Sequence, residues 1–336
     1  MQYTVSPLFT DEYLVARYKT GKPDVRSILR GFVRRLLLSH NFDQYDLVVI
    51  EKELVPYMPV HFEQLFLKKM RAYTLDIDDA LFHIYDQHRS TLIKSILHDK
   101  YSRLMSGASL ITAGNSYIAS YSRQYTGKVE LLPTVVDIAK YQADQGPGER
   151  VFTIGWIGTP NTQKYLQLIA GPLRRFFRRR KGCLLVVGAN AEFRLNGVPI
   201  VTVPWSEESE ISLLRSMDVG IMPLPDLPLE RGKSGLKLLQ YMACRKPVVA
   251  SPVGVNSELV STKTGFLVGD DDMWFSSLLS LADNPALRDA MGLEGRRLVE
   301  EKYTLTQWAP RYAQMLFEAV RVDGKASRPR VSNGSN

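Results

Sequence analysis

The sequence is poor in the features that mark secreted and membrane-spanning proteins. Only two cysteines, Cys183 and Cys244, occur in 336 residues. They are too few for a disulfide framework or a four-thiolate metal site, so we expect a protein of a reducing cytosol. No apolar run approaches the ~20 residues that cross a bilayer. The first fifteen residues carry Asp11 and Glu12 and lack a basic segment followed by an apolar one, so we expect no secretory signal.

What the chain does contain is typical of globular proteins. Hydrophobic residues make up 45% and charged residues 23%, which excludes a disordered or fibrous chain. The length favours two domains. The net charge of +8 is accompanied by no nucleic-acid-binding module, so we expect no nucleic-acid partner. All five histidines lie in the first hundred residues, so only the first half supplies a histidine for chemistry.

Short apolar runs alternate with longer amphipathic stretches, a pattern typical of βαβ units that build a parallel sheet. The predicted strands are residues 47–50, 72–77, 109–113, 129–132, 151–157, 183–188, 200–204, 219–223, 247–250 and 265–268. The predicted helices are residues 60–70, 90–106, 115–124, 164–180, 207–216, 234–245, 272–283, 286–301 and 304–320.

The polar segment YQADQGPGER, residues 141–150, predicts a linker between two halves of this series. We therefore predict an α/β protein with two doubly wound, Rossmann-like domains that face each other across a cleft. The first domain is residues 1–146 and the second is residues 147–303. A helix at 304–321 is expected to pack back on the first domain, and residues 322–336 to be a disordered tail.

The segment Gly232-Lys233-Ser234-Gly235 connects a buried strand to an amphipathic helix. Unpaired N–H groups at a helix start, preceded by glycine and flanked by Lys233 and Lys237, form an arrangement that binds phosphate. It is not a P-loop, because position 227, where that motif needs glycine, is leucine. The alternative is an ordinary turn with solvated lysines.

The segment GWIGTP places Gly155 and Gly158 at the end of a predicted strand, where glycine lets a ligand approach the backbone. The alternative is an ordinary strand-to-helix turn. A dinucleotide fingerprint is absent, because the glycine spacing differs and the region about twenty residues further on is basic. The sequence therefore disfavours an NAD enzyme.

Together these segments resemble a glycosyltransferase of the family 4 type, with the GT-B fold. The similar parts are GWIGTP, LLVVGAN at residues 184–190 and the block at residues 218–254, with looser likeness in DLVVIEKELVP, LDIDDALF and ITAGNSYIASY. The resemblance implies sugar transfer from a nucleotide-diphosphate-sugar to an acceptor hydroxyl, with retention of configuration, in polysaccharide or glycoconjugate assembly. It implies no cofactor and no required metal, and a glycan or lipid-linked acceptor as partner.

The resemblance also assigns residues to roles. It places the donor sugar nucleotide against Gly158, Thr159, Lys164, Gly188, Trp205, Ser234, Gly235, Leu236 and Gln240. Lys233 and Lys237 would stabilise the departing diphosphate. His83, because it follows Asp79 by four residues, is expected to approach the acceptor hydroxyl unless it is a simple surface residue. Asp76, Asp78 and Asp79 would lie on the acceptor side, as binding or helix-capping groups in preference to a metal site.

The chain departs from the family pattern at three places. The first glutamate of the family's E-x7-E pair falls on Gly232 and the second on Gln240, while Glu230 is two positions out of register. The chain opens at TVSPLFTDEYL, so the first strand, loop and helix of the first domain are expected to be missing or diverged. These departures favour the alternative of a degenerate protein that acts as a binding or regulatory subunit. A nucleotide-sugar epimerase on the same fold is a further alternative.

Two stretches, residues 26–38 and 172–181, combine an apolar stripe with several arginines. Such helices bind anionic membrane surfaces, which suits a lipid-linked acceptor and a peripheral location on the inner face of a membrane. The alternative is that both are ordinary domain helices with a solvated charged face.

Overall fold

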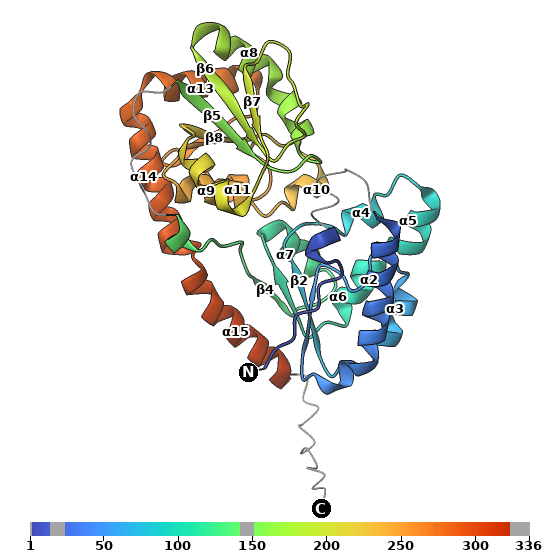
Figure 1. Cartoon of the computed structure of the whole chain (residues 1–336). Helices are drawn as coiled ribbons and strands as arrows, with labels where there is room; N and C mark the ends of the chain where they lie inside the picture. Colours follow the sequence, from blue (N-terminus) through green and yellow to red (C-terminus); the bar gives the residue numbers. More distant parts are fainter. Residues whose placement is uncertain (1, 14–23, 142–150, 323–336) are drawn as a thin grey trace, which may run out of the picture.

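The structure is a computed structural model of the chain and describes residues 2–13, 24–141 and 151–322. It contains two α/β domains, each built on a parallel sheet, which lie one above the other in Figure 1. The predicted fold class is confirmed. The predicted linker, apart from Tyr141, and the predicted tail, apart from Val322, lie outside the described residues.

The first domain has a four-stranded parallel sheet in the order β1-β2-β3-β4. Its strands are β1 (Val48–Glu51), β2 (Tyr73–Ile77), β3 (Leu110–Ala113) and β4 (Val129–Leu131). Its helices are α2 (Val25–Leu38), α3 (Val60–Leu67), α4 (His83–Asp86), α5 (Thr91–Leu97), α6 (Lys100–Ser106) and α7 (Ser116–Ser122), with short 3-10 helices η1 (Ser39–Gln44) and η2 (Ile138–Lys140). No strand lies in the described residues that precede β1.

The second domain has a six-stranded parallel sheet in the order β10-β9-β8-β5-β6-β7. Its strands are β5 (Phe152–Ile157), β6 (Gly182–Val187), β7 (Ile200–Val203), β8 (Val219–Met222), β9 (Val248–Ala250) and β10 (Gly265–Leu267). Its helices are η3 (Gln163–Ile169), α8 (Ala170–Arg179), α9 (Glu207–Arg215), α10 (Pro228–Arg231), α11 (Leu236–Ala243), α12 (Asn256–Leu259), α13 (Asp271–Asp283) and α14 (Pro285–Lys302). The strand order reverses between β5 and β8, which is where ligands bind in such sheets.

Each predicted strand forms within one residue of its expected ends, but several predicted helices were wrong in extent. The helix predicted at 90–106 is two helices, α5 and α6. The helix predicted at 164–180 is η3 followed by α8. Pro172 lies in the first turn of α8, and its ring would clash with the carbonyl four residues earlier if one α-helix ran through both segments. The helix predicted from 234 begins at Leu236, since Gly235 has a left-handed backbone with φ 73°.

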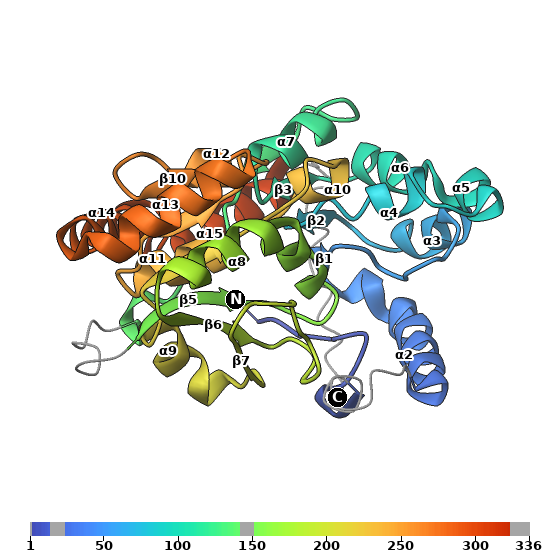
Figure 2. The same ribbon diagram turned by 90° about the horizontal axis from the view of Figure 1, so that it is seen from above.

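The last helix, α15 (Leu305–Val322), carries the chain from the second domain back to the first. The turn into α15 is tied to the first domain, because Val136 accepts a hydrogen bond from Leu305 N and donates one to the Tyr303 carbonyl, both 3.0 Å. In Figures 1 and 2, α14 lies on one side of the molecule and α2, α3 and α5 lie on the opposite side. No helix among the described residues is long and apolar enough to span a bilayer.

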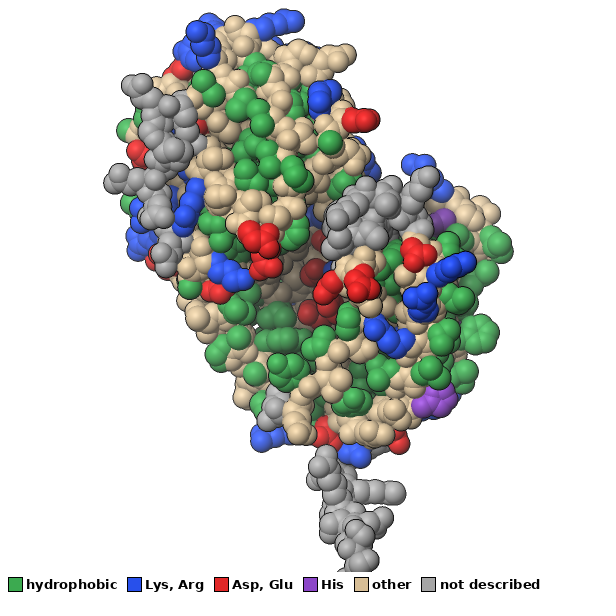
Figure 3. All heavy atoms as spheres, in the orientation of Figure 1, with side chains coloured by type: hydrophobic (Ala, Val, Ile, Leu, Met, Phe, Trp, Pro, Cys, Tyr) green, Lys and Arg blue, Asp and Glu red, His purple; other side chains and the backbone are tan. Residues whose placement is uncertain are grey.

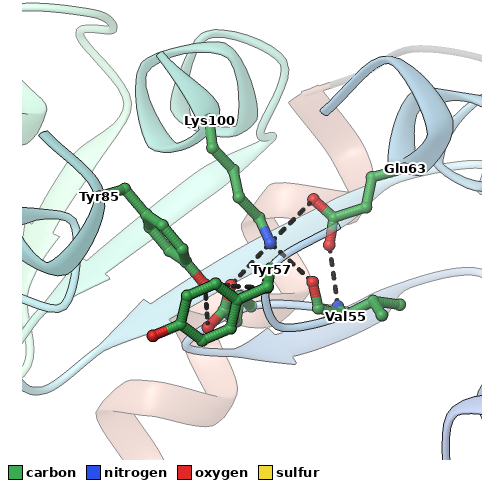
Figure 4. Close-up of polar contacts among 6 residues, drawn as sticks. Val55, Tyr57, Glu63, Tyr85 and Lys100 are labelled. Atoms are coloured by element: carbon green, nitrogen blue, oxygen red, sulfur yellow. Dashed lines mark hydrogen bonds and ion pairs between the residues drawn. The ribbon is translucent and has the colours of Figure 1, made fainter. Parts of the chain in front are cut away.

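A fully buried lysine organises the loop that follows β1 (Figure 4). The Lys100 ammonium lies 2.7 Å from a Glu53 oxygen and 3.5 Å from a Glu63 oxygen, and it donates to the Val55 carbonyl at 2.6 Å. The other Glu63 oxygen accepts from Val55 N at 2.8 Å. Burial raises the pKa of Glu63 to about 7. The network therefore pairs both the N–H and the carbonyl of Val55, at the centre of the loop.

This loop is strained at both ends. Lys52 and Tyr57 have left-handed backbones, with φ 66° and 58°, a conformation that costs non-glycine residues about 1–3 kcal/mol each. Tyr57 N donates to the Tyr85 hydroxyl at 3.0 Å, and that hydroxyl donates to Glu53 at 2.8 Å. The buried lysine network therefore offsets strain in a loop at the carboxyl end of the sheet.

Replacing the buried cation will destabilise the protein strongly. Lys100→Met leaves Glu53 and Glu63 without a counter-charge, so we expect the free energy of unfolding in urea to fall by about 3–5 kcal/mol. The control is Arg103→Met on the same helix, which removes an exposed ion pair to Asp99 and is expected to cost less than about 1 kcal/mol. Equal losses for the two variants would contradict the assigned role of Lys100.

Candidate active site

Three of the predicted donor-binding residues come together where strands of the second sheet end. Gly158 follows β5, Gly188 follows β6 and Trp205 lies two residues after β7. A Cβ atom on Gly188 would come within 2.3 Å of the Gly158 carbonyl oxygen and 3.3 Å of the Trp205 Cβ, and the Gly188 φ is 80°. Only glycine fits that position, because both the backbone conformation and the close approach exclude a side chain. The Trp205 side chain beside it is 50% exposed.

The start of α11 brings a lysine against this loop. The Lys237 ammonium lies over the Trp156 ring, 4.5 Å from its centre, and a Cβ on Gly158 would be 2.9 Å from that nitrogen. Burial lowers the pKa of Lys237 to about 7, and the positive charge of Lys233 acts in the same direction. A nearby anion would favour the charged form of Lys237, because opposite charges stabilise each other.

Lys233 lies at the contact between the two domains. Its ammonium is 3.3 Å from an Asp79 oxygen of the first domain. Its carbonyl accepts from Asn115 Nδ2 at 3.1 Å, and Asn115 Oδ1 caps α7 by accepting from Ile118 N at 2.9 Å. Lys233, Lys237 and the positive end of the α11 dipole together form a site suited to a phosphate or diphosphate.

The remaining predicted donor residues surround this site less closely. Thr159 forms a local turn in which its N–H donates to the Thr162 hydroxyl at 3.1 Å. Lys164 is exposed and its ammonium lies 5.2 Å from the centre of the Tyr165 ring. Ser234 and Leu236 flank Gly235 at the start of α11, partly and largely exposed respectively.

Gly232 packs against the first domain. A Cβ on Gly232 would lie 2.1 Å from the Ala80 Cβ, so this arrangement of the domains leaves no room for a side chain at position 232. The contact with Ala80 is therefore a steric reason why position 232 holds glycine where the family pattern has glutamate. Glu230 does not replace it, because its side chain is buried and accepts a hydrogen bond from the Tyr165 hydroxyl.

A carboxylate that the sequence did not reveal lies beside Gln240. The Gln240 side-chain nitrogen donates to Glu210 Oε1 at 2.8 Å, and Trp205 Nε1 donates to Glu210 Oε2 at 2.7 Å. The Tyr141 hydroxyl completes the group by donating to Glu210 Oε1 at 3.3 Å. No motif marks Glu210 in the sequence: Trp205 is five residues away, but Gln240 and Tyr141 lie 30 and 69 residues away along the chain.

The structure does not support His83 as a catalytic residue. Its Nδ1 is paired with Asp86 at 3.0 Å and its Nε2 with the Tyr117 hydroxyl at 2.8 Å. The ring is buried and packs against Phe82 at 4.5 Å. Because both nitrogens already have partners, this histidine is not placed to accept a proton from a bound hydroxyl.

The three predicted acceptor-side carboxylates follow one another at the end of β2. Asp76 accepts from the Thr112 hydroxyl at 2.8 Å, Asp78 lies 3.5 Å from the Lys52 ammonium, and Asp79 pairs with Lys233. Burial raises the pKa of both Asp76 and Asp78. None of them caps α4, which has no side-chain cap. Figure 3 shows acidic side chains on both sides of the hollow between the domains.

Metal binding by these carboxylates is not indicated. In the described parts of the chain, no group of three or more His, Cys, Asp or Glu side chains is arranged to hold a metal ion. That the protein needs no metal stays a prediction.

Comparisons with known proteins identify the fold. Residues 149–284 match the family model for glycosyl transferases group 1. Sucrose-phosphate synthase from Thermosynechococcus elongatus is similar in structure, with a TM-score of 0.69 and 18% identity over 87% of this chain and 78% of that chain. HepE from Anabaena in complex with UDP-glucose is similar with a TM-score of 0.67 and 14% identity, over 84% and 82% of the two chains. No curated protein sequence matches the chain significantly. The two parallel domains are therefore those of the GT-B fold.

Anion binding at the start of α11 will depend on pH through Lys237. With a pKa of about 7, this lysine is charged below neutrality and loses its proton as the pH rises. We expect sulfate, whose own charge is constant in this range, to bind about tenfold more weakly at pH 8 than at pH 6. Calorimetric titration at fixed ionic strength measures this difference.

The matched variant is Lys237→Arg, which stays charged across that range and should bind sulfate almost equally at both pH values. Lys181→Arg, at the amino end of β6 and so at the other end of the strands, should keep the pH dependence of the wild-type protein. The same pH dependence in Lys237→Arg would show that another group is responsible.

Proposed function

We propose that this protein is a glycosyltransferase that moves a sugar from a nucleotide-diphosphate-sugar to an acceptor hydroxyl. The observation that carries the proposal is the pair of lysines at the start of α11: Lys237 lies beside Gly158, and Lys233 is held by Asp79. This pair lies in the part of the chain that matches glycosyl transferases group 1. The similarity to HepE, which was solved in complex with UDP-glucose, supports the same kind of donor.

The site residues suggest how the donor is held. The diphosphate lies against the two ammonium groups and the N–H groups of α11, which stabilise the charge that develops as the nucleoside diphosphate leaves. Trp205 and Gly188 adjoin the base. Gln240 and Glu210 bind the ribose hydroxyls, so the carboxylate expected on α11 is supplied by α9 instead.

We further propose that transfer retains the anomeric configuration. The acceptor approaches from the first domain, on the same face as the leaving diphosphate, and that phosphate helps to remove the acceptor proton. His83 has no part in this step, because both its nitrogens are occupied. Since the lysines supply the positive charge, no metal is required. Polysaccharide or glycoconjugate assembly is the process that such a transfer serves.

The best alternative is a degenerate protein that binds a nucleotide without transferring a sugar. The absence of a side chain at Gly232, enforced by contact with Ala80, favours it. A nucleotide-sugar epimerase is less well supported, because the one histidine considered for catalysis, His83, is buried and already paired.

Nucleotide binding separates these functions. We expect UDP-glucose or another member of a nucleotide-sugar panel to raise the melting temperature, and Lys233→Ala and Lys237→Met to weaken its binding at least about tenfold, since each charged hydrogen bond contributes about 1.5–3 kcal/mol. Lys181→Ala is the control, because Lys181 precedes β6 at the other end of the strands and is exposed.

The outcomes distinguish the glycosyltransferase, the degenerate binding subunit and the epimerase. Nucleoside diphosphate release in the presence of an acceptor, with a retained anomer by proton NMR, supports the proposed transfer. Binding without release on any acceptor supports the degenerate subunit, whereas conversion of the donor to its epimer supports the epimerase. Failure of every nucleotide to bind would refute all three.

We also propose that the first domain docks on an anionic membrane surface. Large apolar side chains are exposed on three of its helices, and they are Val25, Leu29, Val33 and Leu37 on α2, Phe62 and Leu65 on α3, and Leu92 and Ile96 on α5. The exposed cations Arg26 and Arg30 lie on α2, and Lys94 lies on α5. Figures 1 and 2 show these helices on the same side of the molecule. Apolar and basic groups on one surface suit an anionic lipid bilayer.

The second predicted membrane helix, α8, does not share these properties. Its apolar residues Leu173 and Phe176 are buried in the second domain. Two of the neighbouring arginines pair with acidic residues, Arg175 with Asp272 at 2.6 Å and Arg180 with Asp283 at 2.6 Å. This helix is therefore an ordinary part of its domain.

Vesicle sedimentation tests the membrane proposal. The protein should bind vesicles that contain phosphatidylglycerol more tightly than pure phosphatidylcholine vesicles. The double variant Leu29→Gln/Leu37→Gln should weaken binding at least tenfold, because burial of each leucine contributes about 1.5–3 kcal/mol. Leu168→Gln, an exposed leucine of the second domain, is the control. Undiminished binding of the double variant would contradict the proposal.

A further inference from the structure

A pocket of about 360 Å³ lies between α15 and the first domain. One wall is the loop after β4, residues 132–135, and the other is one face of α15, from Leu305 to Leu316. Two carboxylates at the end of β2, Asp76 and Asp78, complete the lining. The pocket therefore uses parts of the chain that are far apart in sequence.

The space exists because large and small residues alternate along one face of α15. Trp308 and Tyr312 stand one turn apart, and Ala309 and Ala313 lie beside them on the same face. The alanines leave room next to the two aromatic rings, while Leu316 further along is buried and anchors the helix. The α15 wall is thus apolar and aromatic. Trp308 Nε1 already donates to the Lys302 carbonyl at 2.7 Å.

The carboxylate end of the pocket is only partly paired with donors of the protein. Asp76 Oδ1 is satisfied by the Thr112 hydroxyl, and Asp78 Oδ2 lies 3.5 Å from the Lys52 ammonium. Within the described residues, Asp78 Oδ1 is buried and has no hydrogen-bond partner. A buried acceptor without a donor costs free energy. The Asp78 side chain as a whole is 45% exposed, so its carboxylate can accept a further hydrogen bond from a hydroxyl bound in the pocket.

The pocket adjoins the proposed donor site. Asp79, the residue after Asp78, forms the ion pair with Lys233. Of these two consecutive residues, Asp78 lines the pocket and Asp79 pairs with Lys233, one of the lysines that would hold the diphosphate. A hydroxyl held at Asp78 would lie on the first-domain side of that diphosphate, where an acceptor must be.

We propose that this pocket binds the acceptor, and that the acceptor is an amphipathic glycoside with an alkyl or aryl group. The apolar group fills the space beside Trp308 and Tyr312, and a sugar hydroxyl donates to the exposed part of the Asp78 carboxylate. A pocket of this size holds one ring and a few further atoms. The proposal rests on the proposed glycosyltransferase function, and it deepens it by naming the acceptor class.

Binding without any nucleotide tests the pocket independently of the donor. Phenyl glucoside and hexyl glucoside, measured by calorimetry or saturation-transfer NMR, should bind at least tenfold more tightly than methyl glucoside. Ala313→Trp fills the space and should reduce phenyl glucoside binding at least tenfold. Gln314→Trp adds the same bulk at an exposed position of α15 and should leave binding unchanged. Ala309→Leu, a smaller change, serves if Ala313→Trp does not fold.

The results separate this proposal from the function on which it rests. UDP-glucose binding should be the same in Ala313→Trp and Gln314→Trp, because neither residue touches the donor site. Failure of all nucleotides to bind, with phenyl glucoside still bound and sensitive to Ala313→Trp, would refute the donor but retain the pocket. Equal affinity for phenyl and methyl glucoside would overturn the pocket proposal, as would tighter binding of hexylamine, which would indicate a cation site.

Discussion

The ion pair between Asp79 and Lys233 is the interaction on which the proposed site depends. It joins the loop after β2 of the first domain to the loop that begins α11 of the second, with a distance of 3.3 Å. Asn115 strengthens the same contact through the Lys233 carbonyl. Two consequences follow from it. Lys233 is held beside Lys237, whose pKa is lowered mainly by burial and further by the Lys233 charge, and the carboxylates after β2 are brought beside the proposed diphosphate site.

The same contact explains how the chain departs from the glycosyltransferases that it resembles. Gly232 touches Ala80 so closely that no side chain fits there, so the loop can approach the first domain only without a carboxylate. At the second position of the pair, Gln240 donates to Glu210 of α9. Glu210 therefore places a negative charge beside Gln240 and Trp205.

The strands could be predicted well because each is a short apolar run buried in a parallel sheet, and such runs are distinct in the sequence. Helix ends were predicted less well, since Pro172 and Gly235 act through local backbone geometry that periodicity does not report. The one-turn helices α4, α10 and α12 were not predicted, because four residues show no period. His83 was assigned from its distance along the chain to Asp79, and the structure shows that its neighbours Asp86 and Tyr117 occupy it instead.

The sequence by itself determined the two-domain α/β architecture and the cationic start of α11, because both depend on residues that are close together in the chain. Only the tertiary structure decided which groups meet them. Glu210 reaches Gln240 across 30 residues, and Lys233 reaches Asp79 across 154. The apolar pocket exists because α15 returns to the first domain and places Trp308 opposite Asp78. Contacts between such distant segments depend on how the domains pack. The pattern of neighbouring residues in the sequence does not encode that packing.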